Sequence, residues 1–90
     1  MLESSHEVHV ALPSGVDLHA RPAGLLVKTA MRFRSKILLV DSVDKEANAK
    51  SVLSVMALGA RGGSALRLRA DGEDAQDALA ALSACVATLR

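Results

Sequence analysis

A histidine, an arginine and a proline stand close together at His19, Arg21 and Pro22. Proline is frequent in the first turn of a helix, so this group predicts a histidine at a helix start. Such a start offers unpaired backbone N–H groups and the positive end of the helix dipole, which together attract anions, phosphate above all. A neutral imidazole there can bind a phosphate or take one onto a ring nitrogen, with the Arg21 guanidinium holding its oxygens. A histidine that only caps the helix is the alternative, and these residues leave both interpretations open.

The elements that must position this group follow from the pattern of polarity. Alternation of apolar and polar residues indicates half-buried strands, whereas apolar residues at helical spacing indicate helices with one buried face. The predicted strands cover His6–Leu12, Ser35–Val40, Glu46–Ala49 and Ser64–Ala70, and the predicted helices cover Ala20–Phe33, Val52–Leu58 and Glu73–Leu89. Alternating strands favour an antiparallel sheet with one wet face. The sequence therefore predicts an α+β fold, a two-layer open-faced β-sandwich of order β-α-β-β-α-β-α, in which three helices cover one face of a four-stranded antiparallel sheet.

Length and composition narrow the class of protein. The 90 residues suit one domain over 1–90, and Phe33 is the one aromatic residue in a chain that is 50% hydrophobic. A net charge of +1 and the lack of stacking side chains disfavour nucleic-acid binding. No apolar run approaches the ~18–20 residues needed to cross a bilayer, and Met1–Ser5 lacks the pattern of a signal peptide. We therefore expect a cytoplasmic protein that neither binds nucleic acid nor inserts into membranes.

Two further side chains, His6 and His9, resemble a metal-binding pair only superficially. His6 and His9 are three residues apart on a predicted strand, so they point to opposite faces of the sheet. Cys85 is the single cysteine, and it lies on the apolar side of the last predicted helix, as a small core residue does. We expect no metal site.

The short helix after Ser51 is apolar nearly all round, with Val52, Leu53 and Met56 among its side chains. So small a domain cannot bury every side of this helix, so an exposed apolar surface for docking a partner is expected. The alternative is a helix fully packed between the sheet and a loop. Ser51 itself is a natural N-cap.

Two separated blocks of sequence resemble one known family. The run Leu18-His19-Ala20-Arg21-Pro22-Ala23 is similar to the active-site signature of HPr, the histidine-containing phosphocarrier family of the bacterial phosphotransferase system. The run from Lys50 to Gly59 is similar to that family's other signature, around its regulatory serine, and Asp71-Gly72-Glu73-Asp74 with Ala78-Leu79 resembles its last turn and helix. The likeness covers about Val8 to Val86, and the family's element order is the one predicted above.

The resemblance implies a carrier rather than an enzyme. In the family, Enzyme I is charged by phosphoenolpyruvate and donates a phosphoryl group to Nδ1 of the histidine that matches His19, and the carrier passes it to an enzyme IIA domain during sugar uptake. Arg21 matches the arginine that contacts the phosphoryl group. Turnover requires these partner enzymes, no cofactor is implied, and a monomer is expected.

The resemblance also implies a partner surface and a regulatory site. Ser51 matches a serine that a dedicated HPr kinase/phosphorylase modifies in part of the family, and a phosphate there would add negative charge beside the docking helix. The residues that match the surface for Enzyme I and enzyme IIA are Ala20, Arg21, Gly24, Leu25, Lys28, Val52, Leu53 and Met56.

Two departures from the family pattern lie just before His19. Asp17 stands where glycine is usual; aspartate tolerates a left-handed backbone, so the turn is expected to survive, with a charge that would repel an incoming phosphate. The preceding loop is about two residues longer than usual. Two other functions stay open: a carrier of the nitrogen-related regulatory branch, and a ferredoxin-like regulatory or RNA-binding module without phosphotransfer. The ending of the second block, Met56 to Gly59, resembles the sugar branch more, and the module would leave the group around His19 unexplained.

Overall fold

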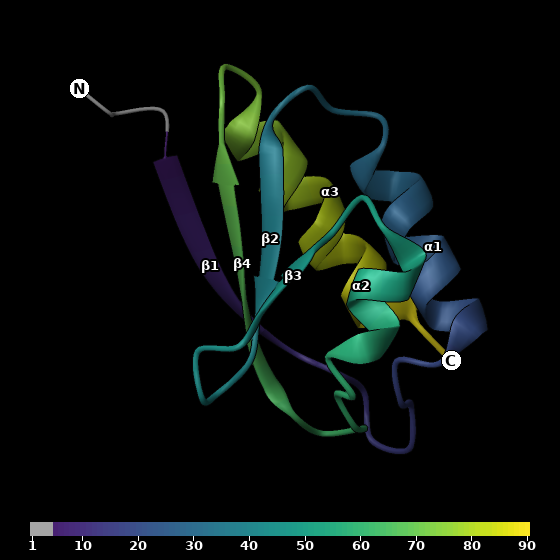
Figure 1. Ribbon diagram of the computed structural model, residues 1–90. Helices are drawn as coiled ribbons and strands as arrows, with labels where there is room; N and C mark the ends of the chain where they lie inside the picture. Colours follow the sequence, from purple (N-terminus) through teal and green to yellow (C-terminus); the bar gives the residue numbers. More distant parts are fainter. Residues whose placement is uncertain (1–4) are drawn as a thin grey trace.

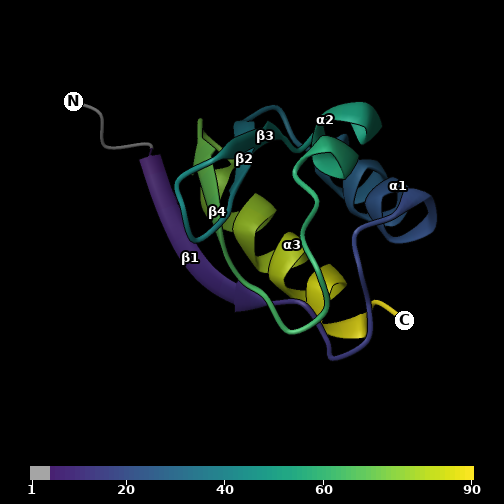
Figure 2. The same cartoon turned by 60° about the horizontal axis from the view of Figure 1, so that its bottom comes forward.

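A computed structural model describes residues 5–90 of the chain and contains the seven predicted elements in the predicted order. The strands are β1 (Ser5–Ala11), β2 (Lys36–Val40), β3 (Glu46–Asn48) and β4 (Ala65–Asp71), and the helices are α1 (Ala20–Ala30), α2 (Val52–Ala57) and α3 (Ala75–Thr88). The four strands form one antiparallel sheet in the order β1-β4-β2-β3 (Figure 1). In the view of Figure 2 the helices all lie to one side of the strands, so the predicted open-faced sandwich is confirmed.

The alternation read from the sequence places one face of each long strand in the core. In β4, Leu66, Leu68 and Ala70 are buried, whereas Arg67 and Arg69 between them reach the opposite face. The helices α1 and α3 cover the apolar face, and their buried residues recur at helical spacing. The core is therefore almost entirely aliphatic, as the single aromatic residue requires.

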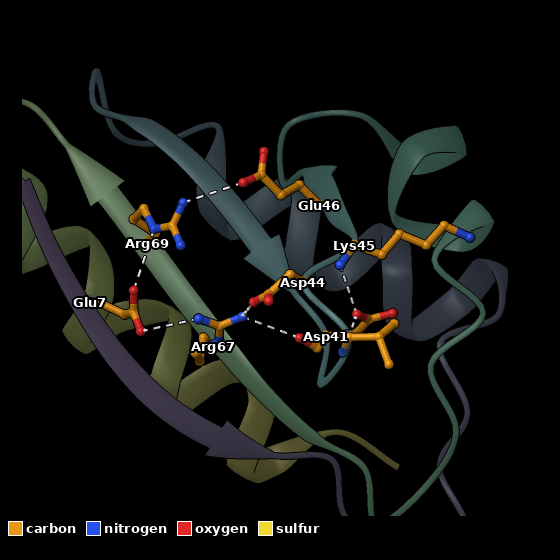
Figure 3. A network of polar contacts seen from close by, with 8 residues as sticks. Glu7, Asp41, Asp44, Lys45, Glu46, Arg67 and Arg69 are labelled. Carbon is orange, nitrogen blue, oxygen red and sulfur yellow. Dashed lines mark hydrogen bonds and ion pairs between the residues drawn. The ribbon is translucent and has the colours of Figure 1, made fainter.

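The uncovered face of the sheet carries a network of charged side chains (Figure 3). The Arg69 guanidinium lies 3.4 Å from the Glu7 carboxylate and 3.3 Å from the Glu46 carboxylate. Arg67 contacts Glu7 at 3.8 Å and pairs with Asp44 in the turn between β2 and β3. Because these pairs are solvated, each adds little stability, and the network mainly keeps this face polar.

Four helix boundaries differ from the prediction: the start of α3 and the C-terminal ends of all three helices, with α2 ending at Ala57 rather than Leu58 and α3 at Thr88 rather than Leu89. The first helix ends at Ala30, not Phe33, because the N–H groups of Arg32 and Phe33 donate to carbonyls three residues back, those of Thr29 and Ala30, at 3.1 and 3.2 Å. The N–H groups of Arg34 and Ser35 then donate to the Asp74 carboxylate at 2.9 and 3.0 Å. The last helix begins after Asp74, not at Glu73. The Ser35 hydroxyl, which is buried, also donates to Asp74, and with the Arg34 N–H it holds the pKa of that carboxyl below its ordinary value.

The expectation that Met1–Ser5 is not a signal peptide concerns mostly residues 1–4, which lie outside the described residues. Across residues 5–90, none of the helices combines the length and the apolar character that crossing a membrane requires.

Candidate functional site

His19 is the N-cap residue of α1, with an extended backbone (φ −83°, ψ −169°). Its carbonyl oxygen accepts the Ala23 N–H at 2.9 Å, which closes the first turn of the helix. The side chain makes no capping hydrogen bond and is exposed. The interpretation of His19 as a residue that caps the helix through its imidazole is therefore wrong, because the ring is free for other chemistry.

The first turn of α1 supplies donors around this imidazole. The N–H groups of Ala20 and Arg21 have no intrahelical acceptor because of their position, and Pro22, which is buried, has no N–H to satisfy. The side chain of Arg21 is exposed. A phosphoryl group on the ring could thus receive hydrogen bonds from backbone N–H groups and a guanidinium, as an anion at a helix start does.

The loop before His19 is fixed by its neighbours rather than by a left-handed aspartate. Among residues 5–90, the non-glycine residue with a positive φ is Asp44, so the expectation of a left-handed Asp17 is wrong. The positive φ falls instead on Gly15 (+81°), inside the loop before His19. Leu18 is buried, and its N–H donates to the Ala60 carbonyl at 2.9 Å, which attaches this loop to the segment after α2.

The short helix α2 presents the expected apolar surface. Leu53 is 80% exposed, and Val52 and Met56 are also exposed, whereas Val55 is fully buried. The alternative of a fully packed helix is therefore wrong. Helices α1 and α2 pack against each other, and with exposed Leu25 of α1 the three side chains of α2 form what we term the docking patch: Leu25, Val52, Leu53 and Met56. The other residues of the expected surface flank it: Ala20, Arg21 and Lys28 are exposed and Gly24 is half-buried.

Ser51 caps α2 as predicted, since its hydroxyl oxygen accepts the Ser54 N–H at 3.2 Å. Sequence reasoning missed three further polar contacts in this region, two of which hold the helix. The Ser54 hydroxyl oxygen accepts the Asn48 N–H at 2.8 Å, and Lys45 donates from Nζ to the Ala57 carbonyl at 3.2 Å. Lys50 donates from Nζ to the Phe33 carbonyl at 2.7 Å. The two lysine contacts join residues that are 12 and 17 positions apart, so no local pattern could have indicated them.

His6, His9 and Cys85, to which the sequence analysis gave no functional role, lie on β1 and α3. On β1, His6 is half-buried and His9 exposed, in step with the alternation of the strand, so the two rings face opposite sides of the sheet. Cys85 packs against the core, as predicted. Within the part of the chain that the structure describes, no group of three or more His, Cys, Asp or Glu side chains is placed to hold a metal ion.

The fold and the site together define a small α+β protein with a free histidine at a helix start, and comparison with known proteins gives its family. The family model described as the PTS HPr component phosphorylation site matches residues 4–88. The chain belongs to the HPr family, and it is a phosphocarrier of the phosphotransferase system. Neither the family model nor the relatives described below favour the two alternative functions, a carrier of the nitrogen branch and a module without phosphotransfer.

Individual HPr proteins are similar to this chain in sequence and in structure. The phosphocarrier protein HPr of Mycoplasma genitalium is 42% identical over 71 residues, which are 79% of this chain and 81% of that protein. The crystal structure of HPr-C-His from Thermoanaerobacter tengcongensis superimposes with a TM-score of 0.86 at 37% identity, over 92% of each chain. The multiphosphoryl transfer protein of Salmonella typhimurium is 44% identical over 72 residues, which are 78% of this chain and 19% of that protein.

Proposed function

We propose that Nδ1 of His19 accepts a phosphoryl group from phosphorylated Enzyme I and passes it to an enzyme IIA domain during sugar uptake. The neutral ring nitrogen attacks phosphorus, an N–P bond forms, and the bond between phosphorus and the donor breaks. The observation that carries this proposal is the exposed imidazole at the start of α1, which makes no capping bond. Transfer to the acceptor repeats the step in reverse and regenerates the free imidazole.

Arg21 has the role of holding the phosphoryl oxygens together with the N–H groups of the first turn. A guanidinium offers a planar fork of donors that matches phosphate geometry, and its charge offsets the charge that arrives with the phosphoryl group. The reaction stays reversible because these donors bind the phosphoryl group without enclosing it.

The docking patch binds both partners in turn. Enzyme I and enzyme IIA would each cover the four apolar side chains, with Ala20, Arg21, Gly24 and Lys28 at the edge of the contact. Met56 suits a surface with two partners because methionine repacks easily. In this proposal residues 1–90 act as one monomeric domain in the cytoplasm, without a cofactor or a metal ion, and turnover depends on the partner enzymes.

Ser51 is proposed as a second, regulatory site for an HPr kinase/phosphorylase. Its hydroxyl is half-buried at the start of α2, directly before Val52 of the docking patch. A phosphate there would add about −1.5 to −2 charges next to the apolar contact and weaken docking of acidic partners. Ser51→Asp should accept phosphate from Enzyme I more slowly than the unmodified chain; an unchanged rate would contradict the regulatory role.

A complete relay tests the transfer function. Enzyme I, labelled phosphoenolpyruvate and an enzyme IIA domain are incubated with and without this chain. Label should reach the IIA domain only when the chain is present, and it should not reach it with His19→Ala. Using Enzyme I and IIA from the sugar branch and from the nitrogen branch in parallel distinguishes the two pathways, and faster labelling is expected in the sugar branch. Absence of transfer in both branches would refute the proposal.

A further inference from the structure

The loop that carries His19 is joined to the loop that follows α2 by four hydrogen bonds. Three are backbone bonds: Leu12 N–H to the Ser64 carbonyl at 3.0 Å, Gly63 N–H to the Leu12 carbonyl at 2.9 Å, and Leu18 N–H to the Ala60 carbonyl at 2.9 Å. The fourth uses a side chain, because the Asp17 carboxylate accepts the Gly62 N–H at 2.8 Å. Figures 1 and 2 both show these two loops side by side.

Gly62 allows the two backbones to approach closely. A Cβ built on Gly62 would lie 2.5 Å from the Gly15 nitrogen and 2.6 Å from the Val16 nitrogen, distances that real side chains do not reach. The contact therefore depends on a residue without a side chain at position 62. Asp17 then fixes the two loops together with a charge-assisted hydrogen bond.

Both loops lead directly to functional parts of the molecule. His19 follows Asp17 by two residues, and its N–H donates to the Asp17 carbonyl at 2.8 Å. On the other side, the segment with Ala60 and Gly62 continues from the end of α2, the helix that bears most of the docking patch. The Asp17–Gly62 bond thus connects the loop that sets the position of the imidazole to the helix that a partner binds.

We propose that Asp17 is a positioning residue for phosphotransfer, an inference that rests on the function proposed for His19. By holding the two loops together, its carboxylate keeps the imidazole at a fixed place relative to the docking patch, where a docked partner presents its phosphoryl group. The aspartate that departs from the family's usual glycine then has a defined role in the longer loop, which is to restrain it. Misplacement of a reacting group by a fraction of an ångström slows a reaction without weakening binding.

Three variants separate this role from an effect of charge. Asp17→Ala removes the acceptor, Asp17→Asn keeps an oxygen acceptor without the charge, and Asp41→Ala is the matched control. The Asp41 carboxylate accepts the N–H groups of Val43 and Lys45 at 2.9 Å in the turn between β2 and β3, which contributes no residue to the docking patch. Transfer from Enzyme I is measured over a range of Enzyme I concentrations, and thermal unfolding shows that each variant is folded.

Asp17→Ala should lower the saturating transfer rate roughly three- to tenfold, as expected for the loss of one hydrogen bond, with the half-saturating concentration of Enzyme I unchanged. Asp17→Asn should stay within about twofold of the unmodified chain, and Asp41→Ala should match it. The proposal is overturned if Asp17→Ala transfers at the normal rate, if Asp17→Asn is as slow as Asp17→Ala, or if Asp17→Asn is faster than the unmodified chain. The last result would mean that the charge repels phosphate.

A second measurement does not depend on phosphotransfer. The Gly62 amide should exchange its hydrogen slowly in the unmodified chain and at least several-fold faster in Asp17→Ala, while the Ala23 amide inside α1 keeps its rate. Equal exchange at Gly62 in both chains would overturn the proposal. If the unmodified chain accepts no phosphoryl group at all, the function proposed for His19 fails, and that failure is distinct from a failure of the Asp17–Gly62 bond.

Discussion

Helix α2 depends on one side chain for its packing and on others for the docking function proposed above, so the two roles can be separated by mutation. Six residues are too few to form a stable helix alone. Val55 is its one buried residue, 0% exposed, whereas Leu53 is 80% exposed on the same helix. Val55→Ala removes two buried carbon atoms, worth about 1.6 kcal/mol in transfer free energy, and the cavity adds up to about 1 kcal/mol. We expect Val55→Ala to lower the free energy of unfolding by about 1.6–2.6 kcal/mol.

Leu53→Ala is the matched variant, and its effect should fall on binding. Its unfolding free energy should change by less than about 0.5 kcal/mol, because the side chain is exposed. Loss of a central apolar contact should raise the half-saturating concentration of Enzyme I roughly five- to thirtyfold. Urea unfolding followed by circular dichroism measures the stability, since the chain has no tryptophan, and phosphorylation at varied Enzyme I concentration measures the docking. Equal destabilisation by both variants, or unchanged docking of Leu53→Ala, would refute this reasoning.

Three further predictions concern Ser51, Arg21 and Asp74. Ser51→Ala should lower the free energy of unfolding by about 1 kcal/mol, the typical value of an N-cap, as measured by urea unfolding. Arg21→Ala should accept phosphate from Enzyme I more slowly than Arg21→Lys, which keeps the charge but not the planar fork; equal rates in a labelling time course would contradict a fork-like contact. In the folded state the pKa of Asp74 is lowered from its ordinary value of 3.8, chiefly by the hydrogen bond from the Ser35 hydroxyl. The ionised Asp74 carboxylate therefore stabilises the fold above pH 3.8, and this stability is lost as the pH falls through the folded pKa. An acid titration of unfolding should show a smaller loss for Asp74→Asn, and an unchanged profile would contradict this.

The pattern of the sequence predicts the elements well where the signal is local. Alternation in β4 assigns Leu66 and Leu68 to the core and Arg67 to the open face, as found, because side chains in a strand change face at every residue. Pro22 marks the start of α1 for an equally local reason. The end of α1 was predicted three residues too late, because the N–H groups of Arg32 and Phe33 donate to carbonyls three residues back instead of four. The bonds from Arg34 and Ser35 to Asp74, about forty residues away, also leave no local pattern.

The site shows the same division between local and distant information. His19 and Arg21 could be proposed from the sequence because a histidine and an arginine beside Pro22 indicate an anion site at a helix start. The sequence could not show that the His19 imidazole makes no capping hydrogen bond, since capping depends on the side-chain rotamer and not on residue type. The hydrogen bond between Asp17 and Gly62 also lay outside the sequence pattern, because Gly62 follows 45 residues later. Lys45 and Lys50 were missed for that reason as well: each reaches a carbonyl in a different element.

Labelling of the three histidine variants tests the central claim most directly. The chain has 3 histidines, so His6→Ala and His9→Ala serve as matched controls for His19→Ala. After incubation with Enzyme I and labelled phosphoenolpyruvate, the unmodified chain and both controls should carry equal, acid-labile label, and folded His19→Ala should carry none. Undiminished acid-labile label on His19→Ala would contradict the assignment of His19 as the phosphoryl acceptor.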